Sequence, residues 1–183
     1  MPCLYSFCLD SMDKIELIGK VVFSPDNKTK KHNKQSSWKK IAMVMFDGDV
    51  SEFYAWFIKK RFNLPLNKPL RGAHISFIND DINKMTQNGK ISIVEAEMAW
   101  SAIKQKWDSK RVPITVSVSP RTNGEHWWLN IPPEHQGLLM GIREELGLGK
   151  PFYGFHLSLG YANDKNIDHS NYIHSLIQQG FVS

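Results

Sequence analysis

Two six-residue segments of this chain match each other position for position. Residues 72–77 read GAHISF and residues 154–159 read GFHLSL, so each has glycine, an apolar residue, histidine, an apolar residue, serine and an apolar residue. Side chains alternate between the faces of a strand, so each histidine projects beside its serine. Independent draws from this composition give about 0.1 copies of the His-apolar-Ser-apolar pattern. The repeat therefore favours a duplicated fold, although each pair also fits the polar face of a half-buried strand.

The order of the predicted elements supports a duplication. The first half reads β-β-α-β-α and the second half repeats that order, with a histidine-bearing strand third among the strands of each half. The predicted strands cover 15–23, 38–46, 70–78, 112–118, 126–131 and 152–161, and the predicted helices start near Asp49 or cover 93–107, 134–147 and 168–180.

Local signals predict how several of these elements begin and pack. Asp49 is the predicted N-cap of the first helix, with Glu52 three residues later. The predicted core face of that helix is Phe53, Trp56, Phe57 and Ile58, and that of the second helix is Ala96, Trp100, Ile103 and Trp107. The turn at 122–125 predicts a hairpin between strands 112–118 and 126–131.

The resulting fold prediction is an α/β (α+β) protein with two pseudo-symmetric lobes around a central cleft. Each lobe is expected to be a small sheet with flanking helices. With 183 residues the chain fits one domain, covering 14–183, with lobes at about 14–110 and 111–183. Residues 1–13 are predicted to form an N-terminal extension.

Composition excludes several classes of protein. The chain is 42% hydrophobic and 22% charged, as in a soluble globular protein, and it has no apolar run long enough to cross a bilayer. Cys3 and Cys8 are too few for a disulfide framework, and the first residues lack the features of a secretory signal, so a cytoplasmic location is expected. The net charge of +5 favours polyanionic partners such as nucleotides or RNA, and no obligatory protein partner is inferred.

The two motifs, His74-Ile75-Ser76-Phe77 and His156-Leu157-Ser158-Leu159, resemble the signature of the 2H phosphoesterases. That resemblance covers most of residues 15–180 and implies two α/β lobes with one motif each, facing a central cleft. Members act on 2′,3′-cyclic phosphates, on 2′-5′ linkages in RNA and, in some phages, on the cyclic oligonucleotide signals of CBASS immunity. The compact size is similar to that phage branch, although phage members carry Thr rather than Ser in the motif.

Imidazole chemistry explains why such a motif suits phosphodiester hydrolysis. The reaction needs a base for the nucleophile and an acid for the leaving oxygen, and two imidazoles fill both roles without a metal or another cofactor. His74 and His156 are therefore the predicted acid/base pair, with Ser76 and Ser158 donating hydrogen bonds to the non-bridging phosphate oxygens. Which histidine is the base stays open.

Other residues are candidates for contacting the substrate. Arg71 directly precedes the first motif, and Tyr153 and Tyr161 flank the second and are candidates for stacking on a base. Trp38 lies in a lysine-rich stretch (Lys28, Lys30, Lys31, Lys34, Lys39 and Lys40) that suits phosphate attraction and base stacking. The alternatives are a solvated arginine, a packed tyrosine and a solvated loop with Trp38 in the next strand. Trp127 and Trp128 must point to opposite faces, which predicts that one is core and the other lines a cleft.

The predicted function is a metal-independent phosphodiesterase that cleaves a cyclic nucleotide, a cyclic oligonucleotide, a 2′,3′-cyclic phosphate or a 2′-5′ linkage. An RNA end-processing, ligase-like activity uses the same residues. The alternative from another class is a non-catalytic α/β module that binds RNA or a nucleotide through the basic stretch and exposed aromatic residues. In either case the cytoplasm, or the host cytoplasm for a phage protein, is the expected location.

Overall fold

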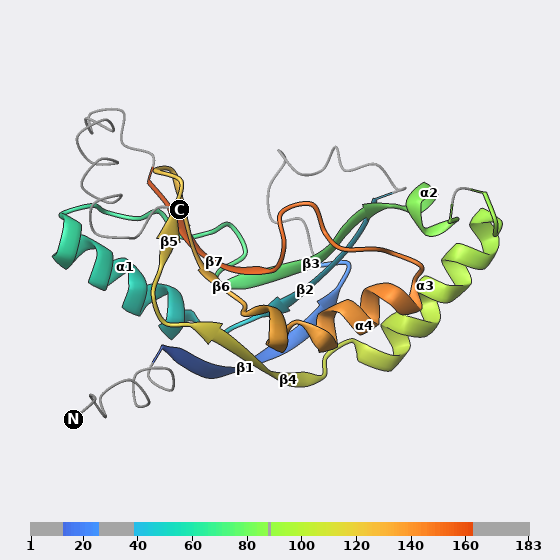
Figure 1. The fold of residues 1–183 in the computed structure, drawn as a ribbon, viewed down its shortest axis with the longest axis horizontal. Coiled ribbons are helices and arrows are strands. Elements are labelled where there is room, and N and C mark those ends of the chain that lie inside the picture. The colour runs from blue at the N-terminus through green and yellow to red at the C-terminus, as the bar shows by residue number, and fades with distance from the viewer. Residues whose placement is uncertain (1–12, 26–38, 88, 163–183) are drawn as a thin grey trace, which may run out of the picture.

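The computed structural model describes residues 13–25, 39–87 and 89–162 (Figure 1). In these ranges, seven strands form one curled antiparallel sheet in the order β4-β1-β2-β3-β7-β6-β5. The strands are β1 (Lys14–Phe23), β2 (Lys39–Met45), β3 (His74–Asp81), β4 (Arg111–Ser117), β5 (Arg121–Thr122), β6 (His126–Asn130) and β7 (His156–Tyr161). The helices are α1 (Gly48–Phe62), α2 (Ile82–Met85), α3 (Ile93–Trp107), the 3₁₀ helix η1 (Pro133–His135) and α4 (Gly137–Glu145).

This architecture confirms the mixed α+β class. All seven strands are hydrogen-bonded into one sheet, so two separate small sheets are not seen among the described residues, and the division into pseudo-symmetric lobes stays a prediction. In Figure 1, α1 lies at the end of the molecule near β5, β6 and β7, whereas α3 and α4 lie toward the other end. The two histidine-bearing strands, β3 and β7, are neighbours in the sheet.

Helix α3 forms where the sequence predicted it. Ser92 and Glu95 make a reciprocal capping box at its start, which satisfies backbone N–H groups that the first turn leaves without helical partners. The predicted core residues Ala96, Trp100 and Ile103 are buried, and Trp107 packs partly against the core. This helix therefore follows from local signals alone.

The prediction for α1 was wrong in two respects. The helix begins at Gly48, with Asp47 rather than Asp49 as the N-cap. Of the predicted core face, Ile58 is buried and Phe57 packs partly against the core, but Phe53 and Trp56 are 56% and 58% exposed, and Ser51 and Tyr54 are buried instead. Tyr54 takes the inward position because its hydroxyl donates a hydrogen bond to the Val118 carbonyl at 2.8 Å, a partner that no local pattern reveals.

The predicted hairpin between 112–118 and 126–131 is also wrong. Strand β4 pairs with β1 in the register Leu17 to Ile114, whereas β6 pairs with the short strand β5 across the turn at residues 123–125. Asn123 stabilises this turn, because its side-chain oxygen accepts a hydrogen bond from the His126 amide at 2.8 Å. The β4–β1 pairing is non-local, so the spacing of turn residues does not predict it.

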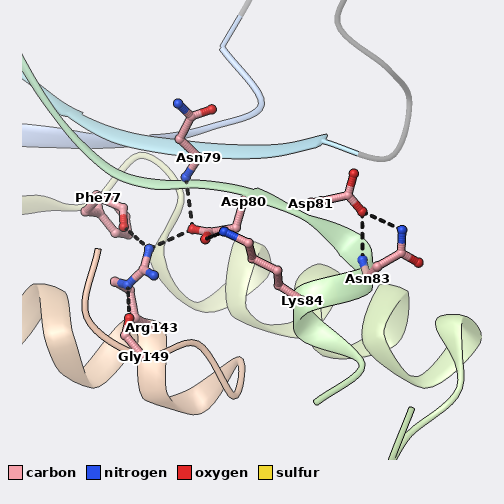
Figure 2. A network of polar contacts seen from close by, with 8 residues as sticks. All are labelled: Phe77, Asn79, Asp80, Asp81, Asn83, Lys84, Arg143 and Gly149. Carbon is pink, nitrogen blue, oxygen red and sulfur yellow. Dashed lines mark hydrogen bonds and ion pairs between the residues drawn. The ribbon is translucent and has the colours of Figure 1, made fainter. Parts of the chain in front are cut away.

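The helix predicted at 134–147 is divided into η1 and α4. The division falls at Gln136, whose side-chain amide donates to the Ile131 carbonyl at 2.8 Å. Helix α4 brings Arg143 into the interior, where it is 3% exposed (Figure 2).

Arg143 ties the end of β3 to the segment that leads toward β7. Its Nη1 donates to the Phe77 carbonyl at 2.7 Å and to Asp80 Oδ2 at 2.8 Å, and its Nε donates to the Gly149 carbonyl at 2.7 Å (Figure 2). Burial raises the pKa of the Asp80 carboxyl, but the hydrogen bond and charge of Arg143, with a contribution from Lys84, outweigh it and the pKa lies below its ordinary value. This buried network fixes the two motif-bearing parts of the chain relative to each other.

Several predicted features lie outside the described residues. They are the extension up to residue 12, the helix at 168–180, Trp38 and the lysines before residue 39. Lys40 is described: its Nζ lies 2.7 Å from Glu97 Oε1 and over the Trp100 ring, so it joins β2 to α3. Within the part of the chain that the structure describes, no helix is long and apolar enough to cross a membrane.

Candidate active site

The two predicted histidines begin adjacent antiparallel strands. His74 is the first residue of β3 and His156 the first residue of β7, and His74 is the direct cross-strand partner of Ser158. Cross-strand partners project from the same face of a sheet. Strand β6 extends this face, because Trp128 is the partner of Ser158 and Asn130 is the partner of His156. His74, Ser158 and Trp128 thus form a row across three strands.

The glycine in each motif sets the orientation of its histidine. Gly72 and Gly154 have φ values of +74° and +68°, a region that side chains with a Cβ rarely adopt. Each carbonyl then accepts a hydrogen bond from the imidazole two residues later, at 2.7 Å between His74 Nδ1 and the Gly72 oxygen. A Cβ at either glycine meets no atom within 4 Å, so backbone conformation rather than lack of space requires glycine.

The contact with the Gly72 carbonyl assigns the tautomer of His74. A carbonyl oxygen only accepts hydrogen bonds, so His74 Nδ1 must carry a proton, and in the neutral ring Nε2 then carries the free lone pair. His156 makes a corresponding hydrogen bond to the Gly154 backbone. The His74 imidazole is therefore oriented to accept or donate a proton through Nε2.

The pKa values of both histidines are lowered. For His74, burial is the main cause, opposed by the hydrogen bond to Gly72, and the charge of Arg71 lowers the pKa further. For His156, burial again lowers the pKa most, the Gly154 bond opposes it, and the charges of His74 and His126 lower it further. The charge of His74 is thus one of the causes that lower the pKa of His156.

A β-bulge places Tyr161 on the same face as the site. Trp128 pairs with Ser158, and His126 pairs with Tyr161. Between these two pairs β6 advances by two residues, whereas β7 advances by three. The extra residue reverses the alternation of β7, so Leu157, Leu159 and Gly160 are buried while Tyr161 is partly exposed. Without the bulge, Tyr161 would share the core-facing side of Leu157 and Leu159.

These residues meet in one cavity of about 230 Å³. Of the residues that the sequence predicted, it brings together His74, His156, Ser158 and Tyr161. The other lining residues are Pro69, Leu70, His126, Trp127, Trp128 and Gly160. Both motif histidines, one motif serine and Tyr161 therefore line a single small cavity.

The remaining predicted site residues lie elsewhere. Ser76 is exposed on β3 and does not line this cavity. Arg71 does not line it either, but its charge is near enough to lower the pKa of His74. Trp38 lies outside the described residues.

Sequence reasoning missed two polar residues of β6: His126, which lines this cavity, and Asn130, which binds the indole of Trp128. Trp128 lies with its ring 6.1 Å from the ring of His156, and its indole N–H donates to Asn130 Oδ1 at 2.9 Å. His126 lies with its ring 6.5 Å from that of Tyr161. The alternation of residues 126–131 predicted that one of Trp127 and Trp128 is core and the other lines a cleft; in the structure Trp127 is 1% exposed and Trp128 lies beside His156.

A second cavity of about 600 Å³ adjoins the first. It shares His126, Trp128 and His156 with the smaller cavity, and its other lining residues are Asn123, Asn130, Tyr153 and Phe155. His156 and Trp128 therefore stand between the two spaces.

Within residues 13–25, 39–87 and 89–162, no three histidine, cysteine, aspartate or glutamate residues are grouped so as to hold a metal ion. No protein-family model, curated protein or solved structure matches this chain. What the site does is therefore inferred from its own geometry.

Proposed function

We propose that this protein is a metal-independent phosphodiesterase of the 2H phosphoesterase type, acting on a nucleotide phosphodiester. The observation that carries the proposal is the convergence of His74, His156 and Ser158 on one cavity from adjacent antiparallel strands. Each histidine is hydrogen-bonded to the backbone of the glycine two residues before it, and burial lowers its pKa. Two oriented imidazoles with lowered pKa values suit general acid/base catalysis.

The proposed reaction uses one imidazole in each protonation state. The neutral histidine takes a proton through Nε2 from the attacking water or ribose hydroxyl, and the protonated histidine gives its Nε2 proton to the leaving oxygen as the P–O bond breaks. The Ser158 hydroxyl donates a hydrogen bond to a non-bridging oxygen, where negative charge develops. Ser76 and Arg71 do not line the cavity, and we propose that they contact the substrate from outside it. The positive charge of Arg71 suits binding of a phosphate.

The two-lobe, pseudo-symmetric arrangement is part of this proposal. A second bulge, between β2 and β3, supports it. Ser76 pairs with Met43 and Ile78 pairs with Ala42, so β3 advances by two residues where β2 advances by one. The bulge that follows Ser76 thus matches the one that follows Ser158, and the burial of both strands changes phase at the equivalent position. In this proposal, β3 and β7 have matching bulges, pair antiparallel and each direct one imidazole at the same phosphate.

The proposed substrates are cyclic nucleotides, cyclic oligonucleotides, 2′,3′-cyclic phosphates and 2′-5′ linkages in the cytoplasm. The net charge of +5 and pI of about 9.1 support a polyanionic substrate. Cleavage of the cyclic oligonucleotide signals of CBASS immunity is the most specific form of the proposal.

A substrate panel tests the proposal. The protein is incubated with 2′,3′-cyclic nucleotides, 2′-5′ oligoadenylates and cyclic di- and trinucleotides in EDTA, beside the His74→Ala/His156→Ala double variant. We expect turnover of at least one class that persists in EDTA and is absent in the double variant. Binding without turnover would instead support a nucleotide-binding module, and turnover abolished by EDTA would contradict the proposed chemistry.

A further inference from the structure

The larger cavity has a composition unlike that of a phosphate site. Its aromatic residues are Trp128, Tyr153 and Phe155, and its amide side chains are Asn123 and Asn130. The described residues that line it include no lysine, arginine, aspartate or glutamate. Aromatic faces and amide groups suit an uncharged, flat ligand with hydrogen-bonding edges.

Tyr153 is the most accessible of these aromatic residues. It is 84% exposed although it lines the cavity, and it directly precedes Gly154, the glycine whose carbonyl contacts His156. Exposure of so large a ring leaves much of its face available for a ligand. The indole N–H of Trp128 donates to Asn130 Oδ1, which leaves that amide its Nδ2 group with two donors and a second lone pair on Oδ1.

We infer that the larger cavity is a nucleobase-binding subsite, in which Tyr153 stacks on a base and the asparagine amides bind its edge. This inference rests on the proposed function, because it takes the scissile phosphate to lie in the smaller cavity. The volume of about 600 Å³ lies within the range of small-molecule sites, and the smaller cavity alone is below that range. The substrate therefore carries a nucleoside that extends past the phosphate.

The shared wall gives the substrate a direction. His126, Trp128 and His156 line both cavities, whereas His74 lines only the smaller one. The nucleoside in the larger cavity thus lies on the His156 side of the phosphate. Of the two motif histidines, His156 is then the one nearer the ester oxygen of that nucleoside, and His74 faces the opposite oxygen.

Tyr153→Ala and Tyr153→Phe test this subsite, with Trp56→Ala as the matched control. Trp56 is an exposed aromatic residue on α1 that lines neither cavity. One measurement is the kcat and KM for adenosine 2′,3′-cyclic phosphate and for 1-O-methylribose 2′,3′-cyclic phosphate, which lacks the base. The other is calorimetric binding of adenosine 5′-monophosphate and ribose 5-phosphate, which needs no turnover.

We expect Tyr153→Ala to raise KM for the adenosine substrate roughly 5- to 100-fold, the effect of losing one base-stacking contact. It should leave kcat and the base-free substrate little changed, Tyr153→Phe should restore KM, and Trp56→Ala should have no effect. Equal affinity of the wild type for ligands with and without the base, or an unchanged KM in Tyr153→Ala, would overturn the inference.

The two measurements separate this inference from the proposed function. If no phosphodiester is cleaved but adenosine 5′-monophosphate binds more tightly than ribose 5-phosphate, and does so through Tyr153, the nucleobase subsite stands and the catalytic proposal fails. If both cyclic phosphates are cleaved equally well by the wild type and by Tyr153→Ala, the catalytic proposal stands and the subsite is wrong.

Discussion

His74 and Ser158, which are 84 residues apart in the sequence, are direct partners across the β3–β7 ladder. The pairing joins the histidine of one motif to the serine of the other. Because the strands are antiparallel, a count of two residues forward on β3 leads to Ser76 and a count of two residues back on β7 leads to His156. A phosphate above this ladder would meet one imidazole from each strand, which is why the proposed acid and base come from different halves of the chain.

Removal of either histidine is predicted to abolish most of the activity. His74→Ala and His156→Ala should each lower kcat by about 10²- to 10⁴-fold, since each removes one proton-transfer group. Because both groups act in one step, the double variant should be little worse than the single variants. His135→Ala is the control, since that histidine is exposed on η1 and lines neither cavity. A single variant with near-normal kcat would contradict the assignment.

The pH optimum of kcat/KM is predicted to lie below the ordinary histidine pKa of about 6.5. The base must be neutral, so its active fraction rises as pH rises through its pKa, whereas the acid must be protonated and is lost as pH rises through its pKa. Burial lowers the pKa of both histidines, so both limbs of the bell-shaped profile should shift to lower pH. A rate profile across the acidic and neutral range measures this, and an optimum well above neutrality would contradict it.

Arg71→Gln refines the pH test. Loss of the arginine charge removes one cause of the lowered pKa of His74, so the limb that belongs to His74 should move to higher pH. Arg61→Gln removes an exposed charge at the end of α1 and is the matched control. A profile that is the same in both variants would show that Arg71 does not act on His74.

The two serines are predicted to contribute unequally. Ser158 lines the cavity, so Ser158→Ala should lower kcat by up to about 10²- to 10³-fold, the loss measured for a single donor to a developing negative charge. Ser76 is exposed outside the cavity wall, so Ser76→Ala should have a smaller effect. Steady-state kinetics of both variants decide this. Equal losses would mean that Ser76 reaches the phosphate once substrate is bound.

Sequence reasoning located the elements whose signals are local. The capping residues Ser92 and Glu95 and the apolar spacing that follows specify α3 without any distant partner. Both histidine motifs also lie on strands, because the alternation of polar and apolar residues is a local pattern. These features needed only neighbouring residues.

The features that were wrong or missed depend on contacts between distant parts of the chain. The inward face of α1 is set by the bond from Tyr54 to Val118, and β4 pairs with β1 rather than with its neighbour β6. Tyr161 was a predicted site residue, but it faces the site because β7 carries one more residue than β6 at the bulge, which the sequence did not predict. No periodicity within one segment encodes such relationships.

Arg143 provides the stability prediction. Arg143→Met should lower the free energy of unfolding by about 3–5 kcal/mol, because it leaves Asp80 without its buried partner and removes the donor to the Phe77 and Gly149 carbonyls. Arg111→Met is the matched control: Arg111 lies 3.9 Å from Asp47 in an exposed ion pair, which contributes less than about 1 kcal/mol. Urea denaturation at neutral pH compares them, and similar losses would show that the network contributes little.

The charge of Asp80 gives the same network a pH dependence. Burial raises its pKa, but Arg143 outweighs burial and the pKa is lowered in the folded protein, so the stabilisation is complete above the unfolded value of about 3.9 and is lost as pH falls through the folded pKa. Asp80→Asn should therefore destabilise the protein at neutral pH and differ less from the wild type as the pH is lowered below about 3.9. Urea denaturation at several pH values measures the difference. A difference that stays constant down to the most acidic pH would mean that Asp80 acts through its shape and hydrogen bonds rather than its charge.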